Sequence, residues 1–554
     1  MKTCLIILMY HCVLFFASCD SDNQVDLILY NGKIFTAKSD SDFVEALAVK
    51  NGEILAVGKS EELLSRYNAH DQDIMDLKNK LVVPGFHDAH LHFWNGTKIK
   101  QQLDLRNIGS REKVIQKIRE YVSKAKPGSW ILGRGWDHEL WPDQKLPDKQ
   151  LLDNISTSHY IYLRRVDGHA CWVNSPVLEK LNYSPATADP AGGKIMRYRN
   201  SKEPNGILFE TAEDPLEKII PEPNDSVKYD WIKKTLPFAN KLGVTSITDQ
   251  SPLSLYPILA ELEKNGELTL RINFWPPYQE NMDSIRQIID AFHRSTRYLK
   301  AEMIKIYADG SLGSRTAYLK NDYDDDPGNK GLLQHPFKEL YLMIRNVYDH
   351  QLFVGIHAIG DAGVSDVLNA YKKTHETDPQ RDYRFRIEHA QMVDPVDFAG
   401  FKKLDVIASM QPSHCITDLH WAENRIGKRA RYAYTWKSFL DRGVRLAFGT
   451  DWPVEPLNPM VGLYASVTRK DTMGYPEDGW YPEEIITMGQ AIMAYTAGAA
   501  YAARNEDWCG TLEPGKVADF AILERDLFTC KPADILSTEV LATYVEGKKV
   551  YGRD

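Results

Sequence analysis

A regular spacing of short apolar runs constrains the fold of this 554-residue chain more than any other feature. Each run is bounded by turn residues, and the gaps between runs are long enough for a helix, which is typical of βα units around a parallel sheet. Eight such runs predict an α/β fold with a (β/α)8 TIM-like barrel, whose functional groups lie at the carboxyl ends of the strands. The runs are residues 81–86, 244–248, 270–275, 303–307, 352–356, 385–387, 406–410 and 445–448.

The two ends of the chain predict a second, smaller unit. Short β-branched runs flank Asn31-Gly32 and Asn51-Gly52, and Asn-Gly between alternating runs is a strong hairpin signal. The C-terminal residues repeat this pattern, and neither end has enough strands to be stable alone. Residues 25–83 and 508–554 are therefore expected to form one composite β-sandwich.

Residues 84–507 would then form the barrel, with a long insertion after its first strand at about residues 93–242. An insertion of this length is expected to cover the active site. It is rich in tryptophan and tyrosine, and an aromatic cluster of this kind is more often a local core than a substrate cage.

The first 18 residues predict a signal peptide. Lys2 precedes an apolar stretch at residues 5–16, which is too short to span a bilayer. Residues 16–19 resemble a bacterial lipobox with Phe where Leu is usual, which predicts cleavage before Cys19 and a lipid on its sulfur. The protein would be a membrane-anchored lipoprotein of the bacterial cell envelope, on its periplasmic or surface side. An ordinary signal, giving a secreted or periplasmic protein, is the alternative.

Charge and cysteine content exclude several partners. The 67 basic and 76 acidic residues give a net charge of −9, which is too mild and scattered to indicate nucleic-acid binding. Beyond the signal no surface apolar stripe is evident, so membrane contact is expected only through the lipid anchor. The four cysteines beyond Cys19 show no CxxC spacing, which predicts neither a disulfide framework nor cysteine-bound zinc.

Five residues at predicted strand ends form a candidate metal site. His90 and His92 are two residues apart, so in an extended chain their imidazoles point the same way. His357, His389 and Asp451 end the fifth, sixth and eighth predicted strands, where the barrel would gather them. Nitrogen and oxygen ligands of this kind suit Zn²⁺, and Mn²⁺ or Fe²⁺ are the alternatives.

Lys305 is the sixth candidate ligand. It lies between two isoleucines in the fourth predicted strand, where an apolar environment disfavours the charged ammonium. A neutral lysine can react with CO₂, and the resulting carbamate could bridge two metal ions. Pairing of Lys305 with an acid such as Asp309 is the alternative.

Long motifs surround these residues. They are PGFHDAHLH, IKIYADGSLGSR, GIHAIGDAG, RIEHAQ, QPSH and FGTDWPVEPLNP, with further signatures at residues 133–137, 166–169 and 510–519. From about residue 25 to the C-terminus, the sequence resembles the amidohydrolase superfamily and specifically its YtcJ-like amidohydrolase-3 branch, which includes N-substituted formamide deformylases.

The resemblance implies a ligand set. His90, His92 and Asp451 would hold one metal ion. His357 and His389 would hold a second ion, with a carboxylated Lys305 between the two. Members of the superfamily bind one ion or two, so either occupancy is compatible with the motifs. The resemblance also implies the composite β-sandwich.

These ligands suit hydrolysis. A bound metal ion lowers the pKa of its water from about 15.7 toward about 7 and polarises a neighbouring carbonyl. Asp451 would take the proton of that water and return it to the leaving nitrogen; a role as ligand alone is the alternative. The expected activity is metal-dependent hydrolysis of a C–N bond, in an amide or an N-acyl or N-formyl group of a small molecule.

Six further residues are candidates for substrate contacts. Three lie in the branch signatures, and three follow the fourth and seventh predicted strands. An arginine among them could instead pair with the acidic run at residues 324–326, and a histidine could be structural. The candidates are Trp136, Asp137, His169, Arg315, Gln411 and His414.

Two other functions fit the same sequence. The first is a metal-binding regulatory lipoprotein without turnover, against which the intact set of six ligand candidates argues. The second is an isomerase or esterase that uses the same barrel. A homodimer is an alternative to a monomer, because dimers are common among such barrels.

Overall fold

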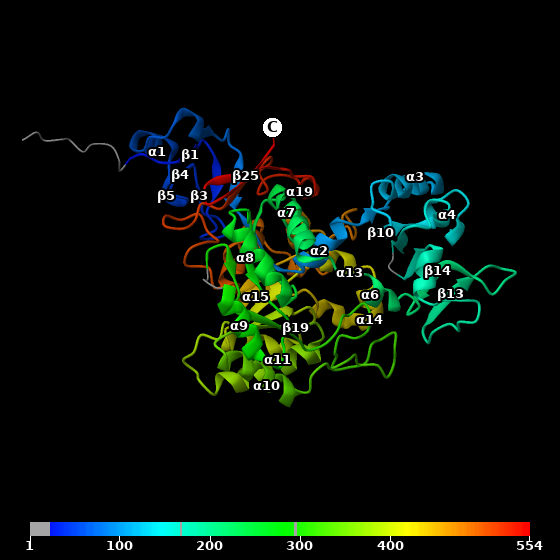
Figure 1. The fold of residues 1–554 in the computed structure, drawn as a ribbon. Helices are drawn as coiled ribbons and strands as arrows, with labels where there is room; N and C mark the ends of the chain where they lie inside the picture. The colour runs from blue at the N-terminus through cyan, green and yellow to red at the C-terminus, as the bar shows by residue number, and fades with distance from the viewer. Residues whose placement is uncertain (1–22, 167–168, 293–295, 554) are drawn as a thin grey trace, which may run out of the picture. The chain divides into compact units, whose positions relative to one another are not determined.

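The computed structural model describes residues 23–166, 169–292 and 296–553 (Figure 1). Two compact units divide the chain: unit 1 holds the residues up to Leu91, Pro237–Gln250 and those from Thr269 onward, and unit 2 holds His92–Leu236 and Ser251–Leu268. The expected signal peptide at residues 1–18 and the expected lipidation site Cys19 lie outside the described residues. In the described part, no helix has the length and apolar character needed to span a membrane.

Unit 1 contains two parallel sheets. Their strand orders are β17-β16-β15-β8 and β18-β19-β20-β21-β22, and neighbouring strands run in the same direction. The strands are β8 (Phe86–Leu91), β15 (Val244–Asp249), β16 (Arg271–Phe274), β17 (Leu299–Lys300), β18 (Met303–Tyr307), β19 (Phe353–Ala358), β20 (Arg386–His389), β21 (Ile407–Met410) and β22 (Leu446–Phe448).

Backbone contacts link the two sheets at both edges. After β16, Pro277 forms a parallel bridge with Lys305 of β18, and the Lys305 amide donates to the carbonyl of Pro276 at 3.0 Å. After β22, the amide of Asp451 donates to the carbonyl of His90 in β8 at 2.7 Å. The carboxyl ends of β8 and β22 therefore lie next to each other.

The first expected barrel strand is wrong in its bounds. Residues 81–84 form β7, which belongs to another sheet, and the parallel sheet begins with β8. Pro84-Gly85 separates the two strands, and a Cβ at Gly85 would lie 2.2 Å from Thr245 Oγ1, so only glycine fits this close approach. All six residues of β8 are buried although three are His or Asp, because the strand crosses the interior with its polar side chains paired.

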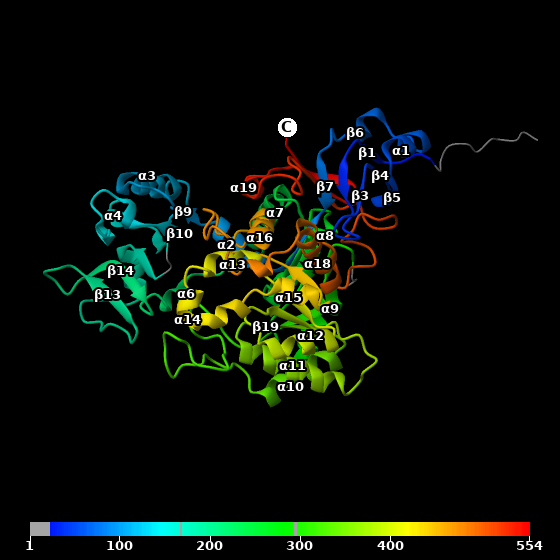
Figure 2. The ribbon, with the colours of Figure 1, turned by 180° about the vertical axis from the view of Figure 1, so that it is seen from behind.

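Helices cover the parallel sheets of unit 1. Helices α10 and α11 pack against each other and against β19 (Figures 1 and 2). In α10 the apolar residues Leu340, Ile344 and Val347 recur at helical spacing and are buried. The helices of unit 1 are α1 (Ser60–Arg66), α9 (Met282–Phe292), α10 (Phe337–Asp349), α11 (Asp361–His375), α12 (Phe398–Lys403), α13 (Pro412–Asp418), α14 (Ala422–Ile426), α15 (Trp436–Asp441), α16 (Pro459–Thr468), α17 (Met488–Ala494), α18 (Ala497–Ala502) and α19 (Pro532–Ile535).

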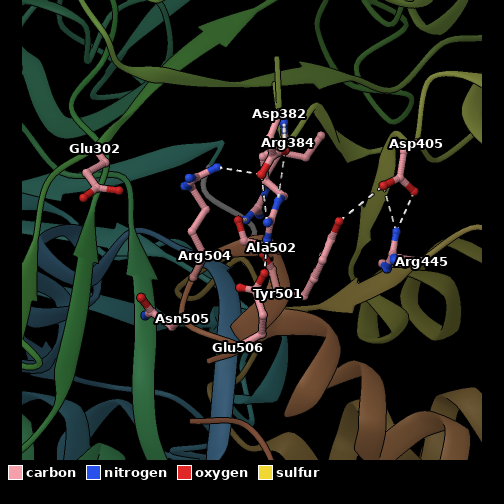
Figure 3. A network of polar contacts seen from close by, with 12 residues as sticks. Glu302, Asp382, Arg384, Asp405, Arg445, Tyr501, Ala502, Arg504, Asn505 and Glu506 are labelled. Atoms are coloured by element: carbon pink, nitrogen blue, oxygen red, sulfur yellow. Dashed lines mark hydrogen bonds and ion pairs between the residues drawn. The ribbon is translucent and has the colours of Figure 1, made fainter. Parts of the chain in front are cut away.

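A charged network lies at the amino-terminal ends of β20, β21 and β22 (Figure 3). Arg445 donates to both oxygens of Asp405, at 2.6 and 2.8 Å. The guanidinium groups of Arg384 and Arg445 lie 3.9 and 4.2 Å from the ring centre of Tyr501 in α18. These contacts hold α18 at the amino-terminal ends of these strands, opposite their carboxyl ends.

Strands from both ends of the chain form the remaining sheets of unit 1. One has the order β5-β4-β1-β6, and the other the order β25-β24-β23-β7-β2-β3, in which C-terminal β23 pairs antiparallel with β7. Side chains of both sheets share one apolar core, for example Leu29, Val82 and Phe520. The strands are β1 (Leu27–Tyr30), β2 (Lys33–Phe35), β3 (Phe43–Val44), β4 (Ala46–Lys50), β5 (Glu53–Gly58), β6 (Ile74–Asp76), β7 (Leu81–Pro84), β23 (Phe520–Leu523), β24 (Val540–Val545) and β25 (Lys548–Gly552).

One of the two Asn-Gly turns closes a hairpin. Asn51 and Gly52 have φ angles of 54° and 77° and connect the antiparallel strands β4 and β5. The hairpin expected at Asn31-Gly32 is wrong, because β1 pairs with β4 and β6 whereas β2 pairs with β3 and β7. The local turn signal is present there, but the two strands enter different sheets.

Unit 2 contains a sheet of order β13-β14-β12-β11-β10-β9. Trp136, Trp141 and Trp172 are buried in its core, with ring centres of neighbouring pairs 6.1–6.3 Å apart. The elements are α2 (Phe93–Lys100), β9 (Leu103–Asp104), α3 (Arg111–Val122), β10 (Trp130–Trp136), α4 (Lys149–Asp153), β11 (Tyr160–Arg165), β12 (Ala170–Val173), α5 (Ser175–Lys180), β13 (Gly193–Arg197), β14 (Pro204–Glu210), α6 (Pro215–Ile219) and α8 (Tyr256–Lys264), and α7 (Asp225–Lys241) continues into unit 1.

Candidate metal centre

Histidine and aspartate side chains gather at the carboxyl ends of the parallel strands. His90 lies near the end of β8, His389 ends β20, and Asp451 follows β22. One ligand atom each from His90, His92 and Asp451 lie within 4.8 Å of one another, and the same holds for His389, His414 and Asp451. Asp451 therefore belongs to both groups.

His357 lies in β19, beside β20. Its ring centre is 4.4 Å from that of His389, and its Nε2 is 3.0 Å from the carbonyl oxygen of Gly310. It belongs to neither of the two groups of described ligand atoms. The six ligands expected from the sequence thus include four that the structure groups closely, with His357 next to them.

Burial keeps the imidazoles neutral. Burial and the nearby Lys305 lower the pKa of His90 to about 4 and the pKa of His357 to about 3. Burial and the neighbouring His357 hold the pKa of His389 well below its usual value. Neutral imidazole is the form that binds metal ions, so these side chains need not lose a proton to act as ligands.

Lys305 in β18 is buried and lacks a hydrogen-bond partner among the described residues. Burial lowers the pKa of Lys305 to about 8. The expected alternative, a pair with Asp309, is wrong, because no ion pair joins these two residues in the described structure. Asp309 instead accepts hydrogen bonds from the backbone amides of Tyr318, Ile359 and Gly360, at 2.9, 3.0 and 2.7 Å.

Glu388 orients His90. Its carboxylate lies 2.5 Å from His90 Nδ1, and it accepts two hydrogen bonds from Arg386 at 2.5 and 2.9 Å and one from Ser409 at 2.8 Å. The Arg386 guanidinium is the principal cause that holds the pKa of Glu388 well below its usual value despite burial. With Nδ1–H donated to Glu388, Nε2 of His90 is the nitrogen that can bind a metal ion.

The loop after β22 is fixed by Asp88 of β8. The Asp88 carboxylate accepts hydrogen bonds from the amide and hydroxyl of Thr450, at 3.0 and 2.5 Å, and from the amide of His90 at 3.1 Å. Asp451 and His389 have φ angles of 57° and 70°, which non-glycine residues adopt at an energetic cost. The amide of Asp451 also donates to the carbonyl of His90 at 2.7 Å, so hydrogen bonds on both sides of the β8–β22 contact hold Asp451 in its strained backbone conformation.

The sequence did not identify Asp88, Arg386 and Glu388 as site residues. A signal was present, because Arg386 and Glu388 alternate in a short strand and both would be buried on one face. Buried charges are rare unless paired, and that rule predicts a partner for each of them.

Three expected substrate contacts lie in unit 2. The Trp136 side chain is fully buried in the aromatic core, which is the alternative expected for this aromatic cluster, and its indole N–H donates to the carbonyl of Leu163 at 2.8 Å. Asp137 caps the short helix at His138–Leu140 and lies 3.4 Å from Arg165. His169 is largely exposed, and its Nδ1 lies 3.0 Å from Glu210.

The other three expected contacts lie in unit 1. Arg315 pairs with Asp325 through two hydrogen bonds of 3.0 and 2.9 Å, which is the expected alternative to an anion contact. Gln411 precedes α13 and is buried, and its Nε2 has no hydrogen-bond partner in the described structure. His414 lies on α13, with its Nε2 3.7 Å from Asp451 Oδ2. Gln411 and His414 thus follow β21, and the structure places His414 at the candidate metal centre.

The candidate ligand atoms of this site fit a divalent metal ion. Lys305 Nζ, His389 Nδ1 and His414 Nε2 are buried and have no hydrogen-bond partner among the described residues. Buried polar atoms are rarely left unsatisfied, and a cation satisfies unprotonated nitrogens. The donor set of nitrogen and carboxylate oxygen suits zinc and other first-row divalent ions.

The sequence profile of the Amidohydrolase family matches residues 73–551. The chain belongs to this family. The putative amidohydrolase YtcJ of Bacillus subtilis (strain 168) is 30% identical over 503 residues, which are 89% of this chain and 93% of that protein. The N-substituted formamide deformylase of Arthrobacter pascens is 24% identical over 507 residues, 88% of this chain and 91% of that enzyme. The resemblance to the YtcJ-like branch is thereby confirmed.

Further similar proteins are consistent with membership of the amidohydrolase family. Protein LONG AFTER FAR-RED 3 of Arabidopsis thaliana is 32% identical over 490 residues, 86% of this chain and 83% of the plant protein. Among solved structures, an uncharacterized metal-dependent hydrolase from Pyrococcus furiosus is 29% identical and superposes with a TM-score of 0.73, covering 91% of this chain and 99% of that one. The protein is a metal-dependent hydrolase of the amidohydrolase family with an α/β, TIM-like fold.

Proposed function

We propose that this amidohydrolase hydrolyses a C–N bond in an amide or an N-acyl or N-formyl group of a small molecule. The gathering of neutral imidazoles and Asp451 at one edge of the parallel strands is the observation that carries the proposal. The similarity to a formamide deformylase over 88% of the chain supports the choice of a C–N bond.

A divalent ion, zinc in this proposal, would be held at the carboxyl ends of the strands. His90, His92 and Asp451 would hold one ion, and His357 and His389 would contribute to a second. A bound ion makes water more acidic and polarises a carbonyl group, which are the two requirements for attack on an amide.

Asp451 would transfer a proton from the attacking water to the leaving nitrogen. Its two carboxylate oxygens lie 3.6 Å from His90 Nε2 and 3.7 Å from His414 Nε2, so it is central among the candidate ligands. It would remove a proton from the attacking water as the C–O bond forms. It would return that proton to the nitrogen as the C–N bond breaks, which yields a carboxylic acid and an amine.

Lys305 would be carboxylated. The neutral amine can attack CO₂ and release one proton, which leaves a carbamate as an anionic oxygen ligand. The burial of Nζ, its lack of a hydrogen-bond partner and a pKa of about 8 support this reaction. Carbon-13 NMR of protein equilibrated with ¹³CO₂ is expected to show a carbamate signal that Lys305→Met loses.

An amine-release screen tests the proposed reaction. Purified protein loaded with zinc is incubated with N-formyl, N-acyl and cyclic amides, and with the matching esters, with and without a chelator. We expect chelator-sensitive release of amine from at least one amide class. Cleavage of esters alone would contradict C–N hydrolysis, and metal binding without turnover of any substrate would favour a regulatory protein.

The N-terminal sequence supports a proposal on location. We propose that cleavage before Cys19 and lipidation of its sulfur anchor the enzyme in the bacterial cell envelope. Radiolabelled palmitate is expected to label the full chain but not a Cys19→Ala variant, which would be found in the soluble fraction.

A further inference from the structure

We infer that His414 is a metal ligand and that it forms, with His389 and Asp451, a metal site separate from the one at His90 and His92. This inference rests on the metal-dependent function proposed above. It assigns to His414 a role different from the substrate contact expected from the QPSH motif.

The ligand atoms have the spacing that an ion requires. Zinc lies about 2.1 Å from a nitrogen or oxygen ligand, so two ligands in tetrahedral geometry are roughly 3.4 Å apart. His414 Nε2 and Asp451 Oδ2 are 3.7 Å apart, and one ligand atom of His389 lies within 4.8 Å of both residues' ligand atoms. A side-chain adjustment of well under 1 Å would bring His414 and Asp451 to coordination distance.

One ring nitrogen of each histidine in this site forms no hydrogen bond in the described structure. His414 Nε2 and His389 Nδ1 are both buried and lack a hydrogen-bond partner among the described residues. The two rings are nearly parallel, with an interplanar angle of 18° and ring centres 6.1 Å apart, so they do not hydrogen bond to each other.

Helix α13 holds His414 in place. The helix begins at Pro412, directly after β21 and Gln411. Asp418, one turn after His414, is mostly buried and accepts hydrogen bonds from the Gln391 amide, at 2.9 Å, and from the Tyr434 hydroxyl. This anchoring fixes the face of the helix that carries His414, because residues four apart lie on the same face.

Asp451 would then be shared by both sites. One of its oxygens faces His90 Nε2 at 3.6 Å, and the other faces His414 Nε2 at 3.7 Å. A carboxylate can bind one cation with each oxygen, which accounts for its membership of both ligand groups.

Metal titration of His414 variants tests the inference. The full chain is stripped of metal and titrated with Co²⁺, and the bound metal, the visible spectrum and the metal-induced rise in melting temperature are measured. His414→Gln keeps a polar side chain of similar length but lacks the imidazole. His420→Gln is the matched control, because His420 is half-exposed and pairs with Asp471 at 3.0 Å.

We expect wild type and His420→Gln to bind two equivalents of Co²⁺. His414→Gln should bind the second equivalent at least about 10-fold more weakly, with a changed spectrum and a smaller metal-induced rise in melting temperature. An unchanged stoichiometry, affinity and spectrum in His414→Gln would overturn the inference and leave the proposed function standing. A wild-type protein that binds no metal would overturn both.

A second variant keeps the test open if His414→Gln does not fold. His414→Cys would supply a thiolate at the same position, and a thiolate bound to Co²⁺ adds an intense sulfur-to-cobalt charge-transfer band. The band is expected in His414→Cys and not in His420→Cys. Its absence in a folded, cobalt-loaded His414→Cys protein would overturn the inference.

Discussion

Replacing Glu388 with glutamine removes a buried negative charge that three neighbours use. Glu388 and Arg386 are both fully buried, and the carboxylate also accepts hydrogen bonds from His90 and Ser409. The glutamine variant leaves the Arg386 charge without a carboxylate in the interior. Breaking a buried ion pair in this way typically costs about 3–5 kcal/mol, so the free energy of unfolding of the metal-free protein should fall by about that amount.

The same change should weaken metal binding. Loss of a carboxylate that orients a histidine ligand typically lowers metal affinity about 10- to 100-fold. Urea unfolding of the metal-free protein measures stability, and calorimetric titration with Zn²⁺ measures affinity. The matched control is Glu302→Gln, because Glu302 forms a partly exposed pair with Lys300 at 3.1 Å and such pairs contribute about 0–1 kcal/mol.

A double variant separates the two effects. Arg386→Leu with Glu388→Leu removes both charges together, and should recover part of the lost stability. It should not recover metal affinity, since His90 Nδ1 still lacks its acceptor. Glu388→Gln with stability and zinc affinity equal to those of the Glu302→Gln control would show that Glu388 neither stabilises Arg386 nor orients His90.

Three further predictions concern other parts of the chain. Trp136→Ala removes a fully buried side chain of the unit 2 core and should lower the free energy of unfolding by about 3–5 kcal/mol. Its control, Leu140→Ala, changes a 48% exposed position and should alter the free energy of unfolding by less than about 0.5 kcal/mol. Equal urea midpoints for the two variants would show that Trp136 does not stabilise the core. Burial raises the pKa of Asp418 from 3.8 to about 6, so its carboxyl binds protons more tightly in the folded state, and its contribution to stability is lost as the pH rises through about 4 to 6. Asp418→Asn should therefore be more stable than wild type at pH 7.5 by up to about 3 kcal/mol, and this gain should disappear below pH 4 in urea unfolding; a gain independent of pH would contradict the assignment. Lys305→Met removes the proposed carbamate and should lower kcat at least about 100-fold while circular dichroism stays unchanged, and a fully active variant would exclude a role for the carbamate.

The parallel strands could be predicted because apolar runs and turn residues are local signals. Seven of the eight expected runs lie on strands of the two parallel sheets, and residues 303–307 coincide with β18. The first run failed because residues 81–84 are more apolar than residues 86–91, although the latter form β8. The interior polar side chains of β8 are buried through pairing with distant residues, and a local pattern does not contain that information.

The candidate site was predictable only where ligands follow strands. His90 lies near the end of β8, His389 ends β20 and Asp451 follows β22, so the topology alone brings them together. The positions of Glu388 and Arg386 at the site depend on the register between β20 and its neighbouring strands. The position of His414 depends on the helix that begins after β21. Trp136 lies in a signature motif, and its side chain fills the core of unit 2. This burial depends on tertiary packing, which a local motif does not show.

The dependence of amine release on bound metal tests the proposed metal-dependent hydrolysis directly. Protein stripped of metal is reconstituted stepwise with Zn²⁺, and the rate of amine release from a substrate found in the screen is plotted against the bound metal per chain. We expect no turnover without metal, a rate that rises with the bound ions, and no turnover in zinc-loaded Asp451→Asn. Metal-free protein that releases amine as fast as the zinc-loaded protein would contradict metal-dependent hydrolysis.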